Sequence, residues 1–105
     1  MDGHITIRYL QDYLMAKDTI PERKKDYCLK LMEEVGELAE ATRKSPPAAT
    51  EERFKGTVEE ELWDVIYYVL VLANCYGIDL EHWIPIKENY NNIRYSTGIS
   101  FELDR

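Results

Sequence analysis

Two pairs of acidic residues in this 105-residue chain have the spacing of ligands on one helix face. Glu34 and Glu37 form the first pair, and Glu61 and Asp64 form the second. Residues three apart on a helix lie one turn apart on neighbouring sides, so each pair weakens its own helix by a few tenths of a kcal/mol. Four carboxylates from two helices packed side by side would form an all-oxygen cage, which suits Mg²⁺ or Mn²⁺. A divalent metal site is therefore our central hypothesis.

Not every acid in these segments is expected to bind a metal. The other glutamates near the two pairs are predicted to form an ordinary solvated surface: Glu33, Glu40, Glu51, Glu52, Glu59 and Glu60.

Apolar residues at helical spacing predict the elements that must position the acids, at about residues 6–17, 22–44, 58–76 and 79–94. Residues 45–50 read as a loop because of their prolines, and residues 96–105 carry little signal beyond a possible extended tail that packs on a neighbour.

Several residues predict where these helices begin and end. Thr57 and Glu60 have the spacing of a capping box, and Gly77 suits a helix C-terminus. Asp79 can cap the fourth helix. Pro85 lies inside that helix, which must then either kink or begin late, near Ile84.

The helix at 22–44 has a predicted buried stripe with Glu34 at its edge. The members of this stripe are Tyr27, Leu31, Val35, Leu38 and Thr42. Gly36 costs roughly 1 kcal/mol of helix stability relative to alanine. We expect a close approach of two helices at Gly36 to be the reason for it.

The helix at 58–76 is apolar nearly all round between Leu62 and Tyr76. A helix of this kind needs neighbours on every side, and so short a chain cannot supply them. The predicted fold is an all-α bundle of three main helices plus a C-terminal helix, completed by homo-oligomerisation with the third helix in the interface.

Length, net charge, the longest apolar run and the cysteine count exclude several classes of protein and partner. The length suits one domain, residues 1–105. A net charge of −7 argues against nucleic acid as a partner. The longest apolar run is too short to cross a bilayer, so no membrane partner is expected. Cys28 and Cys75 are too few to staple a secreted fold, which favours the cytoplasm.

The residues around the acidic pairs resemble the MazG-like family of all-α nucleoside triphosphate pyrophosphohydrolases. Residues 30–41 are similar to the first family motif, and residues 60–68 are similar to the second. The third family motif has a lysine, an asparagine four residues later, and then a basic residue followed by tyrosine. This chain matches it with Lys87, Asn91, Arg94 and Tyr95. The family commonly has proline where this chain has Ser96. The resemblance covers roughly residues 6–96.

The resemblance implies a Mg²⁺-dependent enzyme, assembled as a homodimer or homotetramer, that cleaves a (d)NTP to (d)NMP and pyrophosphate and cleans the nucleotide pool. Glu34, Glu37, Glu61 and Asp64 would then be the metal ligands. Because water attacks the α-phosphorus, a catalytic role as proton acceptor falls to Glu37 or Glu34.

Other residues are candidates for holding the nucleotide. Lys87 and Asn91 would touch the phosphates, and Arg94 would either join them or pair with a neighbouring carboxylate. Residues that could stack on or hydrogen-bond to the base are Gln11, Tyr9, Tyr13, Trp63 and Tyr68. Aromatic residues at helical spacing are more often part of a core, and that alternative stays open for each of them.

Competing functions also stay open at this point. Within the same fold group the substrate could be phosphoribosyl-ATP, or the enzyme could be selective for dCTP or dUTP. A helical interaction module that binds a divalent metal and has no turnover is the alternative from a different class.

Overall fold

The computed structural model describes residues 3–102, which are all helix and loop without a strand. The elements are α1 (Ile7–Asp18), the short 3-10 helix η1 (Pro21–Arg23), α2 (Lys24–Lys44), α3 (Val58–Cys75) and α4 (Leu80–Arg94). The predicted all-α fold and its four helices are therefore confirmed, with small shifts at their ends.

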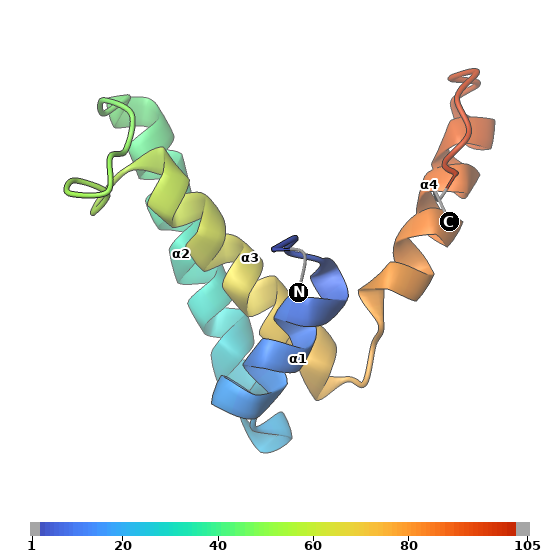
Figure 1. Cartoon of the computed structure of the whole chain (residues 1–105), viewed down its shortest axis with the longest axis horizontal. Helices are drawn as coiled ribbons and strands as arrows, with labels where there is room; N and C mark the ends of the chain where they lie inside the picture. Colours follow the sequence, from blue (N-terminus) through green and yellow to red (C-terminus); the bar gives the residue numbers. More distant parts are fainter. Residues whose placement is uncertain (1–2, 103–105) are drawn as a thin grey trace.

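Three of the helices form a bundle, and the fourth leaves it (Figure 1). The long helices α2 and α3 run antiparallel beside each other, and α1 packs on α3. A small core between them contains Leu14, Tyr27, Leu70 and Val71. These residues come from all three helices, so the core fixes the register between α2 and α3.

The inward stripe of α2 differs from the predicted one. Val35 and Thr42 are exposed, whereas Ala41 is buried and Glu34 is half-buried. The stripe therefore turns by about one residue and carries Glu34 into the contact with α3. The expected close helix approach at Gly36 is wrong within this chain, because a Cβ there would meet no atom within 4 Å.

The start and end of α3 follow the predicted signals. The Thr57 hydroxyl accepts a hydrogen bond from the backbone N–H of Glu60 at 3.2 Å. The Glu60 carboxylate in return accepts from the N–H of Gly56 at 2.7 Å, one residue earlier than in a standard capping box. At the other end Gly77 has a φ of 66°, which an L side chain rarely adopts.

Helix α4 is continuous through Pro85 and begins at Leu80, as its Asp79 cap predicts, so the alternative of a late start near Ile84 is wrong. It turns by 106° from α3 and stands apart from the bundle (Figure 1). Large apolar side chains on it are exposed, among them Trp83, Ile86 and Ile93.

The start of α4 is held by α1. The backbone N–H of Arg8 donates to the Glu81 carboxylate at 2.7 Å, and the Arg8 guanidinium donates to Asp79 at 2.8 Å. Beneath this pair the buried Gln11 side chain accepts from the N–H of Leu80 at 3.1 Å.

The segment after α4 folds back along the same helix. Asn89 and Phe101 are joined by two hydrogen bonds, of 2.9 and 3.4 Å, so the described tail packs on its own chain. Packing of this tail on a neighbouring chain stays a prediction, and residues 103–105 lie outside the described part. Among the described helices no single one has the length and apolarity to cross a bilayer, although the bent pair α3 and α4 meets both criteria when taken together.

Candidate active site

Three of the four predicted metal ligands converge where α2 faces α3. One carboxylate oxygen each from Glu34, Glu61 and Asp64 lies within 4.8 Å of the other two. Glu34 comes from α2, and the other two come from one turn of α3. The shifted stripe of α2 is what brings Glu34 into this contact.

Two oxygens of this cluster are buried without a partner. Glu34 Oε2 and Glu61 Oε2 have no hydrogen bond to any described residue. Leaving such an atom unpaired costs about 1–3 kcal/mol, and more if it is charged. A divalent cation coordinated by these oxygens would remove that cost, so the donor set and its burial fit a hard metal ion such as Mg²⁺ or Mn²⁺.

Burial and mutual repulsion make these acids hard to ionise. Burial, a hydrogen bond with Glu37 and the nearby acidic charges raise the pKa of Glu34 to about 7. Burial first, then the charges of Glu37 and Asp64, also raises the pKa of Glu61. Burial and the charge of Glu60 raise the pKa of Asp64. A divalent cation bound by these carboxylates would offset their mutual repulsion and favour their ionised forms.

The fourth predicted ligand, Glu37, borders the other three. It lies within hydrogen-bond reach of both Glu34 and Glu61, whose pKa values it raises. Its side chain is more exposed than theirs. All four predicted carboxylates therefore come together, with Glu37 on the open side.

Sequence reasoning missed two residues beside the cluster. Lys55 Nζ lies 2.8 Å from Glu60 Oε2, and the side chain of Glu60 is only 14% exposed. The Lys55 pKa is raised mainly by Glu60 and further by Asp64 and Glu61, so its charge acts on the cluster. Glu60 is therefore not the solvated surface acid that the sequence suggested. Only the capping spacing of Glu60 with Thr57 pointed to its position.

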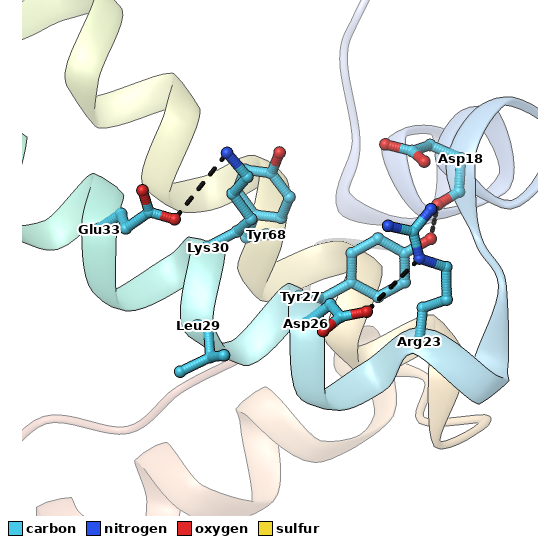
Figure 2. A pocket seen from close by; sticks show the side chains of 8 residues that line it. All are labelled: Asp18, Arg23, Asp26, Tyr27, Leu29, Lys30, Glu33 and Tyr68. Carbon is cyan, nitrogen blue, oxygen red and sulfur yellow. Dashed lines mark hydrogen bonds and ion pairs between the residues drawn. The ribbon is translucent and has the colours of Figure 1, made fainter.

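The cluster lies between two hollows. A cavity of about 470 Å³ is bordered by Lys30 and Tyr68, one helical turn from Glu34 and Asp64 respectively (Figure 2). A smaller hollow of about 180 Å³ on the other side is bordered by Glu37 and Glu61 themselves.

The base-binding candidates are scattered over the bundle. Tyr68 lines the larger cavity. Tyr9 is half exposed on α1, and Trp63 packs edge-on against Tyr67 at 5.9 Å between ring centroids. Gln11 is buried, and its side-chain amide is hydrogen-bonded to Asn74, Ile78 and Leu80. Among these candidates, Tyr68 is the one that combines an aromatic ring with a position one helical turn from the carboxylates.

The phosphate-binding candidates are not brought to the carboxylates within one chain. Lys87, Asn91 and Arg94 lie on α4, which points away from the pair α2 and α3 (Figure 1). Lys87 lies over the ring of Tyr90 at 5.3 Å, and Arg94 lies over the ring of Tyr95 at 5.2 Å. A site that uses them needs a second chain or a different α4 orientation.

Comparisons with known proteins agree on one family. The profile of the MazG nucleotide pyrophosphohydrolase domain matches residues 22–88, which include all four clustered acids. A curated relative, dCTP pyrophosphatase 1 of Bos taurus, is 35% identical over 77 residues. That match covers 69% of this chain and 46% of the bovine protein, so the chain spans about half the length of the relative.

Solved structures give the same result for the fold. One crystal structure of iMazG from Vibrio DAT 722 is 43% identical, with a TM-score of 0.78, over 84% of this chain and 99% of that one. A second structure of iMazG is 42% identical, with a TM-score of 0.79, over 87% and 98% of the two chains. The resemblance seen in the three sequence motifs thus extends to the arrangement of the helices.

Proposed function

The chain belongs to the MazG nucleotide pyrophosphohydrolase family, and from this premise we propose that it hydrolyses a (d)NTP to the (d)NMP and pyrophosphate at the carboxylate cluster between α2 and α3. The observation that carries the proposal is the convergence of Glu34, Glu61 and Asp64 with two unpartnered buried oxygens. Glu37 is proposed as the fourth ligand.

In the proposed reaction, water attacks the α-phosphorus and pyrophosphate leaves, which concentrates negative charge in a protein that is itself acidic. Mg²⁺, or Mn²⁺ in its place, would offset this charge when bound and would lower the pKa of the attacking water. The chain's own part is to hold the ligand oxygens and to take the proton from the water. Glu37 suits the second task because it lies on the open side of the cluster, and Glu34 is the alternative.

We propose that a second copy completes the site. Helix α3 exposes Leu62, Ile66 and Val69, and α4 exposes a further row of large apolar side chains. A monomer rarely leaves so many of them in water, whereas a symmetric dimer or tetramer would cover both faces. In such an assembly Lys87, Asn91 and Arg94 of one copy can reach the carboxylates of another and bind the phosphates.

The pyrophosphate released from a nucleotide panel tests the proposal. The panel contains the canonical dNTPs and NTPs, dUTP and phosphoribosyl-ATP, each assayed with Mg²⁺, Mn²⁺ and Co²⁺. The name of the bovine relative makes dCTP the first substrate to test. Pyrophosphate release that requires the metal would support a metal-dependent pyrophosphohydrolase, for which we propose house-cleaning of the nucleotide pool as the role. Silence across the panel would favour the metal-binding helical module without turnover, and hydrolysis of phosphoribosyl-ATP alone would favour that specialised activity.

The cytoplasm is the proposed location. Both cysteines, Cys28 and Cys75, are free thiols in the structure, as expected where disulfides are not formed.

A further inference from the structure

The cavity of about 470 Å³ next to the carboxylate cluster is lined by polar side chains that could hydrogen-bond to a nucleobase (Figure 2). It lies between the end of α1, η1, the first half of α2 and Tyr68 of α3. Lys30 precedes Glu34 by four residues, and Tyr68 follows Asp64 by four. Because α2 and α3 run antiparallel, both steps lead in the same direction, about 6 Å along the groove.

This distance suits a nucleotide whose α-phosphate lies at the carboxylates. A single ribose joins the α-phosphate to the base, so the base of such a nucleotide would enter this cavity. The ring of Tyr68 lines it and offers a stacking surface. The polar groups of the cavity wall would then determine which nucleobases can hydrogen-bond there.

Asp18 is the acid in this wall whose position is fixed. The Tyr67 hydroxyl donates to Asp18 Oδ2 at 2.6 Å, and the Tyr27 hydroxyl donates to the Asp18 backbone carbonyl at 2.8 Å. Burial and the hydrogen bond to Asp18 raise the pKa of Tyr67, so this donor keeps its proton at every physiological pH. Tyr27 of α2 and Tyr67 of α3 therefore hold Asp18, the last residue of α1, in place.

Asp18 also differs from the other acids of the wall in having no cation. Asp26 pairs with Arg23 at 3.6 Å, and Glu33 pairs with Lys30 at 3.8 Å (Figure 2). Within residues 3–102, Asp18 makes no ion pair, and its Oδ1 accepts no hydrogen bond. Asp18 thus presents one free, oriented acceptor to the cavity.

A carboxylate oxygen offers lone pairs only, so it accepts an N–H and repels a carbonyl oxygen. Cytosine and adenine carry an exocyclic amino group where uracil and thymine carry a carbonyl. We propose that Asp18, oriented by Tyr67, determines base specificity by accepting a hydrogen bond from this amino group, so that dCTP and dATP are preferred over dUTP and dTTP. The inference deepens the proposed function and depends on it.

The test compares dCTP with dUTP, which differ at this edge of the base and in little else. We expect kcat/KM of the unmodified protein to favour dCTP by about tenfold or more, since the half-buried Asp18 acceptor would face a carbonyl oxygen of dUTP and stay unpaired there. In Asp18→Asn the amide can turn its NH2 toward the carbonyl, so the ratio should fall to near one, with a gain for dUTP. Tyr67→Phe keeps the ring and frees Asp18, so it should lower the ratio in the same direction.

Asp26→Asn is the matched control. It removes a carboxylate from the same wall, but this one is exposed and paired with Arg23. We expect the ratio to stay within about twofold of the original, because exposed ion pairs contribute little. Thermal melts of all variants check that they fold.

Two outcomes would overturn the inference. One is an unmodified protein that hydrolyses dCTP and dUTP equally well, and the other is a dCTP preference that Asp18→Asn leaves unchanged. Hydrolysis in either case would leave the proposed function standing. If no nucleotide is hydrolysed, the proposed function fails, and a binding experiment still tests the specificity. The NMR shifts of the Asp18 and Tyr68 amides are then compared on addition of dCMP and of dUMP. Equal shifts with the two nucleotides would refute the role of Asp18.

Discussion

Gln11 and Asn74 exchange hydrogen bonds in the buried contact between α1 and α3. Gln11 Nε2 donates to Asn74 Oδ1 at 3.0 Å, and Asn74 Nδ2 donates to the Gln11 backbone carbonyl at 2.9 Å. Gln11 also binds the carbonyl of Ile78 and the N–H of Leu80, so this pair holds the turn from which α4 departs. A base-binding candidate from the sequence thus ties three helices together.

Replacing Gln11 with alanine should lower the free energy of unfolding by about 2–3 kcal/mol, because Asn74 and the N–H of Leu80 lose buried partners. Denaturant melts measure this. Asp12→Ala, at an exposed neighbour on α1, is the control and should stay within about 0.5 kcal/mol. A Gln11 variant as stable as the control would refute the structural role.

Stability without metal should depend on pH through Glu34. The unfolded chain ionises this group near 4.5 and the folded chain at about 7, so the folded state binds an extra proton between these values. In EDTA the free energy of unfolding should therefore fall as pH rises from 4.5 to 7. Glu34→Gln should flatten this fall, and an unchanged slope in the variant would assign it to another group.

Added Mg²⁺ should reverse that loss, because the ion binds the ionised carboxylates and only in the folded chain. The melting temperature at pH 8 should rise with Mg²⁺ concentration and rise less at pH 5. A rise of equal size at both pH values would show that the ion binds elsewhere.

Asp64→Ala should abolish metal-dependent pyrophosphate release while leaving the fold as stable or more stable in EDTA, because it removes one of several repelling acids. Glu37→Ala should behave alike. Glu52→Ala, at an exposed loop acid, is the control and should keep full activity. Activity of the Asp64 variant within a few-fold of the original would remove Asp64 from the ligand set.

Mixing two inactive variants should restore activity if α4 acts on a neighbouring copy. Glu37→Ala removes a proposed metal ligand, and Lys87→Ala removes a proposed phosphate-binding group on α4. In a mixed dimer, one of the two sites therefore combines intact carboxylates from one copy with an intact α4 from the other. After subunit exchange we expect about a quarter of the original activity, since about half the dimers are mixed and half their sites are whole. No recovery would place both parts in the same chain, and sedimentation of a folded monomer would remove the assembly altogether.

Local signals in the sequence predicted most of the fold. Thr57 and Gly77 act on the backbone next to them, so the ends of α3 could be placed without the structure. The effect of Pro85 on α4 was harder to predict. A helix can contain a proline near its start if one carbonyl, here that of Glu81, gives up its intrahelical hydrogen bond.

Properties that depend on packing could not be predicted as well. The sequence placed Glu34 at the edge of a stripe that included Val35, whereas packing against α3 selects Glu34 itself. A Cβ at Gly36 would meet no atom of residues 3–102 within 4 Å, so no close helix contact explains this glycine. No local pattern in the sequence singles out Asp18, since the Tyr67 hydroxyl that donates to it lies 49 residues away along the chain.

We propose that carboxylates from α2 and α3 hold the same divalent ion. Anomalous X-ray scattering from crystals soaked with Mn²⁺ and a non-hydrolysable dCTP analogue measures this most directly. We expect a manganese peak within about 2.0–2.3 Å of oxygens from Glu34 on one helix and from Glu61 or Asp64 on the other. A peak that contacts only one of the two helices, or no peak in this cluster at full soaking, would contradict it.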